Sequence, residues 1–291
     1  MQYNTNNMAK FIIYTYQFSP INIKQLALFD DVSKESDAIM KKKQVFFERI
    51  FRSDFVFENN HKQYAHKMLF NKDHLIVFRL ANDKKIKLEE NFKTNKVVHS
   101  PSCLILIDNR NDVQKIAIEE NKEAFVDTKT VANILQATFQ KLLMTFNLSV
   151  EIQKEYQVSE FWDIAEKYRK GLTMVRFEFS YPNLPRVSKN INELISNTSK
   201  AMNSRRTVFE LKSDDSEVLK LSRKNTQLNG LVEASAISGN AITIKAKGVR
   251  NFIKTGNTEK AFEVDDLESQ LKDDLIYSVS SKLIELLNEV K

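Results

Sequence analysis

The sequence predicts an α+β fold, because three patterns follow one another along the chain. In the first half, apolar runs are separated only by short polar turns, which is typical of an antiparallel meander sheet packed with helices. In the second half, alternating strands are interspersed with segments of helical periodicity. The last segment, 265–291, carries leucines at helical spacing after an Asp-x-x-Glu capping pattern, and this predicts a C-terminal amphipathic helix.

The first half is expected to be one lobe, residues 8–150, behind a short disordered tail at 1–7. Strands are expected at 10–21 and repeatedly between 66 and 119, with turns at 71–73, 82–83 and 108–112. The run CLILI, which contains the single cysteine Cys103, is apolar enough for a central strand covered on both faces. Helices are expected over 24–51 and 127–148, the second capped by Asp127 or Thr128.

The second half, residues 151–291, is expected to be a basic lobe with a strand–helix–strand rhythm. Helices are expected at 159–170, 187–203 and 216–228, and strands at 174–179, 207–212, 241–247 and 260–264. The stretch MVRFEF alternates apolar and polar residues, so one face of its strand should be buried and the other should meet solvent.

Composition excludes several classes of protein. Five glycines among 291 residues leave no Gly-rich phosphate loop, and one cysteine allows neither an internal disulfide nor a thiolate zinc cage. We therefore expect a cytoplasmic protein in a reducing compartment, with no cofactor. No signal-peptide pattern and no apolar run of about 20 residues occurs, so no membrane partner is expected.

Positive charge is concentrated in one segment. The formal net charge is +6, and residues 200–260 hold twelve Lys or Arg against six Asp or Glu, an excess equal to that of the whole chain. This segregation favours a non-enzymatic protein that binds the phosphates of nucleic acid; the bland alternative is a solvated face that keeps the protein soluble. The candidate contacts are Arg176, Arg205, Arg206, Lys212, Lys220, Arg223, Lys224, Lys245, Lys247, Arg250 and Lys254.

An alternative hypothesis is a divalent-metal nuclease. Glu210-x-Lys212 places a carboxylate and an amine on one strand face, after Glu178 on an earlier strand and Glu166 on a helix. Such carboxylates would hold Mg²⁺ or Mn²⁺, and the lysine would stabilise charge on the phosphate. The competing interpretation is an ordinary half-exposed strand face; outside this nuclease alternative we expect no metal site.

A second alternative is a protein-interaction subunit, in which the C-terminal helix binds a partner or a second copy in a homo-oligomer. The opening MAKFIIYTYQFSPI (8–21), the meander with CLILIDNR, the long central helix and the basic second lobe together resemble uncharacterised bacterial proteins from phage-defence loci. The layout is similar to that of the DNA-binding component of the Kiwa defence system. This resemblance implies a cytosolic protein that meets nucleic acid or a phage component as part of an oligomer, and it carries over no site residues.

Overall fold

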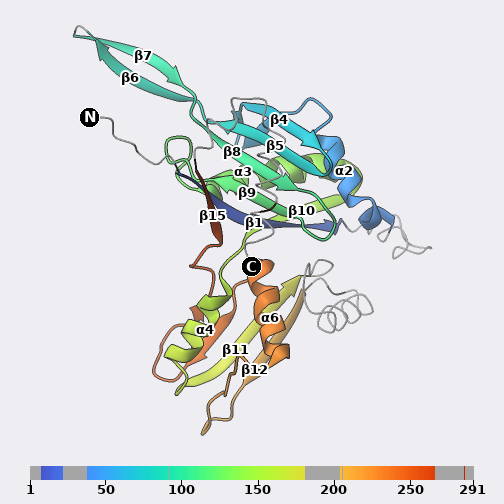
Figure 1. Ribbon diagram of the computed structural model, residues 1–291, viewed down its shortest axis with the longest axis vertical. Helices are drawn as coiled ribbons and strands as arrows, with labels where there is room; N and C mark the ends of the chain where they lie inside the picture. Colours follow the sequence, from blue (N-terminus) through green and yellow to red (C-terminus); the bar gives the residue numbers. More distant parts are fainter. Residues whose placement is uncertain are drawn as a thin grey trace. The chain divides into compact units, whose positions relative to one another are not determined.

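The computed structural model describes residues 8–21, 38–90, 92–180, 204, 206–265 and 285. The predicted tail at 1–7, most of the predicted C-terminal helix, the helix at 187–203, the first part of the helical stretch 24–51 and Arg205 lie outside these ranges. Within them the chain is mixed α and β with antiparallel sheets, as predicted (Figure 1).

The described residues group into two compact units. The first takes in 8–14, 20–21, 38–152 and 261–265, and the second takes in 15–19 and 153–260. Along the chain, the first unit gives way to the second between Ile152 and Gln153. The chain returns to the first unit at its last described strand, which pairs Ala261 with Ile12 and Asp265 with Met8.

A seven-stranded sheet forms the centre of the first unit. Its path is β10-β1-β9-β8-β5-β4, and β15 also pairs with β1. The strands are β1 (Met8–Pro20), β4 (His66–Lys72), β5 (Leu75–Ala81), β8 (Ser102–Asp108), β9 (Lys115–Glu119), β10 (Leu148–Lys154) and β15 (Ala261–Asp265). The predicted central strand is β8, buried along Cys103–Asp108 between β5 and β9. Burial raises the pKa of the Cys103 thiol.

Two helices and an aromatic cluster pack in the first unit. They are α2 (Lys43–Ile50) and α3 (Thr128–Leu143), and the short 3-10 turn η1 (Met144–Phe146) follows α3. Asp127 caps α3 as predicted, accepting a hydrogen bond from the Thr130 amide. Aromatic rings from α2, α3 and β5 meet here. The ring centroid of Phe47 lies 5.0 Å from that of Phe139, and the ring centroid of Phe57 lies 5.9 Å from that of Phe139 and 5.1 Å from that of Phe78. Among the described helices, none combines the length and apolar character that crossing a bilayer requires.

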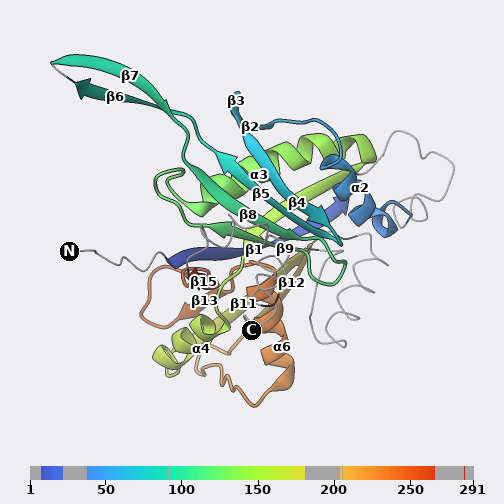
Figure 2. The same cartoon turned by 45° about the horizontal axis from the view of Figure 1, so that its top comes forward.

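The predicted meander is only partly correct. The hairpins β4–β5 and β8–β9 form where expected, but β5 pairs directly with β8. The intervening residues form a separate two-stranded hairpin, β6 (Lys84–Glu90) and β7 (Lys93–His99), which projects from the sheet in both views (Figure 2). Local alternation predicts strands here but carries no information about which neighbour they pair with. A further small hairpin, β2 (Phe57–Asn59) and β3 (Lys62–Tyr64), and strand β10 were not predicted.

The second unit is a four-stranded antiparallel sheet with two helices on one face. The sheet order is β12-β11-β13-β14, with β11 (Leu172–Ser180), β12 (Arg206–Lys212), β13 (Thr243–Ala246) and β14 (Ile253–Lys254). Val175, Phe177 and Phe179 of β11 are buried in one cluster with residues of α4 (Val158–Lys167) and α6 (Thr226–Ile237). The residues that alternate with these buried ones, such as Arg176 and Glu178 of β11, therefore lie on the opposite face of the sheet.

The predicted helix at 216–228 is wrong. Residues 213–225 have no regular structure, and the helix α6 begins only at Thr226, where the Asn225 side chain accepts from the Gln227 and Leu228 amides. Leu219 and Leu221 both pack against the core of the unit, and a spacing of two is that of an extended chain. The Leu219 amide donates to the Leu172 carbonyl at 2.8 Å, which fixes the segment beside β11.

Candidate functional site

The sheet face opposite α4 and α6 collects predicted cations from all four strands of the second unit. In register, Arg176 lies between Glu210 on β12 and Thr243 on β13, and Thr243 lies opposite Lys254 on β14. The next row places Met174 between Lys212 and Lys245. The basic members of this face, which we call the open sheet face, are Arg176, Arg206, Lys212, Lys245 and Lys254.

Two glutamates lie among these cations and pair with three of them. Glu210 accepts from Arg176 Nε at 2.5 Å and lies 2.7 Å from Lys212 Nζ. Arg206 pairs with Glu178 on the neighbouring strand. The hydrogen bonds from Lys212 and Arg176 hold the pKa of Glu210 below its usual value, so this carboxylate stays ionised. Among the described residues, five cations against two carboxylates leave the open sheet face with an excess of three positive charges.

Several cations of the open sheet face remain accessible in spite of this pairing, whereas Lys245 is half-buried and its Nζ donates to the Val249 and Arg250 carbonyls at 2.7 and 2.8 Å. The side chains of Arg206 and Lys212 are 65% and 66% exposed, and Lys254 is exposed as well. Ion pairs between such exposed groups are weak, typically below about 1 kcal/mol, and phosphates can compete for the cations. Phe252, which sequence analysis missed, is 56% exposed, and its ring centroid lies 5.4 Å from Lys245 Nζ. A lone aromatic in the basic turn VRNFIK was the only signal for it.

The four residues of the nuclease hypothesis are not brought together. Glu178, Glu210 and Lys212 share the open sheet face, but Glu166 lies on α4, which packs on the opposite face through Phe161 and Trp162. Glu166 is 73% exposed and pairs with Arg169. In the described part of the chain, no group of three or more His, Cys, Asp or Glu side chains is placed to hold a metal ion.

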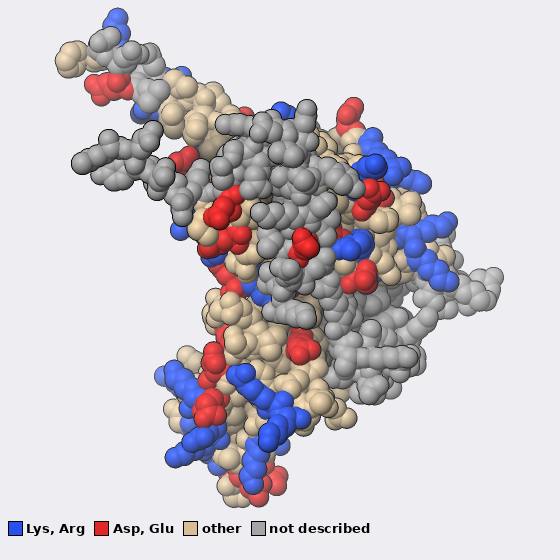
Figure 3. Space-filling view, in the orientation of Figure 1, with Lys and Arg blue, Asp and Glu red and all other residues tan. Residues whose placement is uncertain are grey.

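The remaining predicted cations lie elsewhere in the second unit. Lys247 Nζ donates to the Asp215 carbonyl at 3.0 Å, and Arg250 lies exposed in the turn after β13. Lys220, Arg223 and Lys224 are exposed in the segment that leads into α6. We call these last three the α6 cluster. Figure 3 shows Lys and Arg side chains, with acidic ones among them, around α4 and α6.

Arg223 of the α6 cluster lies against the helix side of the unit. The Arg223 guanidinium carbon lies 5.5 Å from the ring centroid of Trp162, which belongs to the core shared with Phe177. The Arg223 carbonyl accepts from the Asn229 side chain. Because Trp162 and the open sheet face lie on opposite sides of β11, Arg223 is separated from the cations of the open sheet face.

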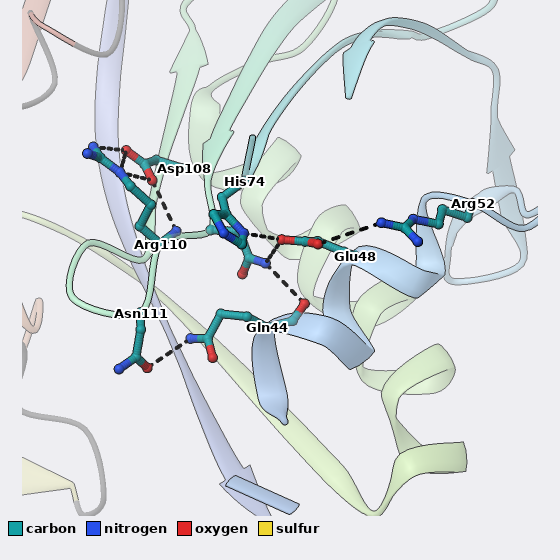
Figure 4. Close-up of polar contacts among 8 residues, drawn as sticks. Gln44, Glu48, Arg52, His74, Asp108, Arg110 and Asn111 are labelled. Carbon is teal, nitrogen blue, oxygen red and sulfur yellow. Dashed lines mark hydrogen bonds and ion pairs between the residues drawn. The ribbon is translucent and has the colours of Figure 1, made fainter. Parts of the chain in front are cut away.

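A polar network that the sequence did not reveal joins α2 to two hairpin turns of the first unit (Figure 4). Glu48 Oε1 lies 2.5 Å from His74 Nδ1 and accepts from Asn109 Nδ2 at 3.1 Å. The fully buried Asn109 also donates to the Gln44 carbonyl, and the Asn109 amide donates to the His74 carbonyl.

Beside this network, Asp108 is 2% exposed and accepts from Arg110, which raises the pKa of the guanidinium. Asn109 contacts Gln44 and Glu48 across 65 and 61 positions of the sequence, and Glu48 contacts His74 across 26, so no local motif could indicate this network. They fix the β4–β5 and β8–β9 turns on α2, and we assign them a structural role.

Comparison of the sequence with known protein families and with curated proteins identifies no relative. No protein-family model matches the chain, and no curated protein shows significant similarity to it.

Proposed function

We propose that the protein is a non-enzymatic, cytoplasmic nucleic-acid-binding protein whose second unit holds the phosphate backbone on the open sheet face. The observation that carries the proposal is the excess of three positive charges there, contributed by side chains from four different strands. Phosphate contacts of this kind give affinity that falls with salt and depends little on sequence.

Two further features support this assignment. Arg176 on β11 and Lys212 on β12 lie on adjacent strands, about 4.8 Å apart, and Lys254 on β14 lies two strands from Arg176 across β13, so successive phosphates of one nucleic-acid strand can reach successive cations. Phe252 offers an exposed ring beside Lys245, and an aromatic face next to cations is a platform on which bases stack. A role in phage defence is part of the proposal and rests on the resemblance in layout.

The experiment that tests the proposal compares two triple variants of the same unit. Arg206→Ala/Lys212→Ala/Lys254→Ala removes three cations from the open sheet face, and Lys220→Ala/Arg223→Ala/Lys224→Ala removes three from the α6 cluster. Both change the net charge equally. Fluorescence anisotropy with a labelled mixed-sequence single strand and its duplex measures the affinity of each at low salt.

We expect the open-sheet-face variant to lose at least about 10-fold in affinity, and the α6-cluster variant to bind within about 2-fold of the wild type. Equal losses in both variants would mean that binding follows net charge alone. Loss confined to the α6-cluster variant would move the interface to the helix side of the unit. Either result contradicts the proposal.

A further inference from the structure

The β6–β7 hairpin continues a strand pair of the central sheet. Ala81 of β5 lies opposite Ser102 of β8, and three residues further out Lys84 lies opposite His99 in the same register. Between them the Asn82 amide donates to the Pro101 carbonyl at 2.9 Å. The ribbon is therefore continuous, embedded in the sheet at one end and projecting at the other (Figure 2).

The base of the projecting hairpin, which we call the arm (Lys84–His99), is fixed to the first unit. Asn82 Nδ2 donates to the Ala124 carbonyl at 2.6 Å, and Lys84 Nζ donates to the Glu123 carbonyl. Seven residues per strand carry the arm roughly 20 Å outward. That length exceeds the depth of either groove of B-form DNA, about 8 Å.

No other described strand pairs with the arm, and all its described side chains from Lys85 to His99 are exposed. An isolated two-stranded hairpin is marginally stable in water. The anchoring at its base keeps the arm in position, but nothing in the described part of the chain covers either of its faces. Both faces are thus available to a binding partner.

One face of the arm is basic. Lys87 lies directly opposite Lys96, and the same face carries Lys85 and the acidic Glu89, two residues to either side of Lys87, so three lysines stand against one glutamate there. Like charges directly opposite in a strand pair are destabilising, so this arrangement favours an anion between or beside them. Over the whole arm, five lysines stand against two glutamates.

The tip of the arm presents an aromatic side chain. Phe92 is 99% exposed, and its φ of 62° lies in the left-handed region that a bulky residue adopts only at a cost of about 1–2 kcal/mol. Glycine is the usual residue at such a hairpin position. On the second face, Ile86 lies opposite Val97, and both side chains are more than one third exposed.

We propose that the arm binds duplex DNA of B form, with Lys85, Lys87 and Lys96 on phosphates along a groove and Phe92 inserted as a wedge at a base step. The grooves of B-DNA admit a two-stranded ribbon, and apolar wedges inserted between base pairs kink the duplex by about 20–90°. The deep, narrow major groove of A-form RNA excludes such a ribbon. A second copy of the chain is disfavoured because two lysine-rich faces repel each other.

This inference rests on the proposed nucleic-acid binding and specifies its substrate class. The test uses the full chain and a duplex that carries 2-aminopurine at a central TA step and a fluorophore pair at its ends. Binding of the wild type should raise the 2-aminopurine fluorescence and shorten the end-to-end distance. Phe92→Ala should abolish both signals. Val126→Ala, which removes another exposed apolar side chain of the first unit, should retain both.

A second pair of variants tests the basic face. Lys87→Ala/Lys96→Ala should lower the slope of log affinity against log salt by about 2 for the duplex, because each phosphate contact contributes about 0.9. Lys122→Ala/Lys129→Ala makes the same change of charge at exposed positions of the first unit and should leave the slope unchanged.

The outcomes separate this inference from the proposed function. If Phe92→Ala and the arm lysine pair bind and kink the duplex as the wild type does, the arm proposal is overturned while binding on the open sheet face stands. Binding of single strands but not of duplex overturns the arm proposal in the same way. If the arm variants instead reduce the mass measured by light scattering, with DNA binding unchanged, the arm binds a second copy and the proposal is wrong. Absence of any nucleic-acid binding overturns both proposals.

Discussion

Arg176 Nε donates to Glu210 Oε2 at 2.5 Å across the β11–β12 strand pair, at the centre of the open sheet face. Lys212 approaches the other oxygen of the same carboxylate, at 2.7 Å. One glutamate thus neutralises part of the charge of two cations, and its removal has opposite consequences under the two functional hypotheses.

Glu210→Gln should increase nucleic-acid affinity by about 3-fold or more at low salt, because Arg176 and Lys212 become available to phosphates. A nuclease that uses Glu210 would instead show Mg²⁺- or Mn²⁺-dependent cleavage that the substitution abolishes. Anisotropy and a gel cleavage assay on the same samples distinguish the two. Lower affinity in the variant, or cleavage that depends on Glu210, contradicts the binding account.

Glu160 stabilises the second unit by accepting hydrogen bonds from the loop 256–258. Its carboxylate, 8% exposed on the first turn of α4, accepts hydrogen bonds from the amides of Gly256, Asn257 and Thr258. Glu160→Gln removes the charge that strengthens these bonds and should lower the unfolding free energy by about 2 kcal/mol in a urea titration. Asp163→Asn, at an exposed position of the same helix, should change it by less than about 0.5 kcal/mol. Equal effects would show that Glu160 has no special role.

Gly239 and Gly248 form a matched pair of substitutions. Both have positive φ, 70° and 78°, but a Cβ on Gly239 would lie 2.5 Å from Gln153 Cβ and 2.8 Å from the Lys154 carbonyl oxygen, while one on Gly248 meets nothing within 4 Å. Gly248→Ala should cost about 1 kcal/mol through backbone conformation alone. Gly239→Ala should cost at least about 2 kcal/mol more, because backbone atoms must move. Equal midpoints in thermal unfolding would contradict the close packing around Gly239.

Stability should also depend on pH through Lys43. This first residue of α2 is 8% exposed, and burial lowers the pKa of its ammonium from 10.5 to about 8. A base whose pKa is lower in the folded state binds fewer protons there than in the unfolded chain between these values, so stability rises with pH across that window. Relative to Lys43→Met, the wild type should gain about 3 kcal/mol between pH 7 and pH 10. Urea titrations of both proteins at pH 7 and pH 10 measure this gain. A difference in unfolding free energy between the two proteins that is the same at both pH values would contradict the burial of Lys43.

The elements that could be predicted from the sequence are those whose signals are local. Asp127 marks the start of α3 by capping chemistry, and the apolar run of β8 marks a central strand. Helix α6 was missed although Asn225 caps it, because the helix buries residues on several sides and holds Gly230 in its interior. The open sheet face followed from alternation in β11, β12 and β13, since strand faces are set by a period of two.

Long-range pairing could not be read from the chain. Nothing around Lys84 or His99 indicates that their strands leave the central sheet, because the register of β5 with β8 decides it. The contact of Glu48 with His74 and the placement of Glu166 away from Glu210 likewise depend on how elements pack. Nothing in the sequence indicated the network around Glu48. The position of Glu166 separates it from Glu210, with which the nuclease hypothesis had grouped it.

The salt dependence of binding by the full chain tests the central claim most directly. We expect log affinity for a mixed-sequence duplex to fall linearly with log salt concentration, and Lys254→Ala to reduce the slope by about 0.9, the value for one phosphate contact. Lys224→Ala, with the same charge change on the α6 cluster, should leave the slope unchanged. An affinity for the duplex that does not change with salt concentration would contradict the assignment of the open sheet face. A slope that both variants reduce equally would contradict it as well.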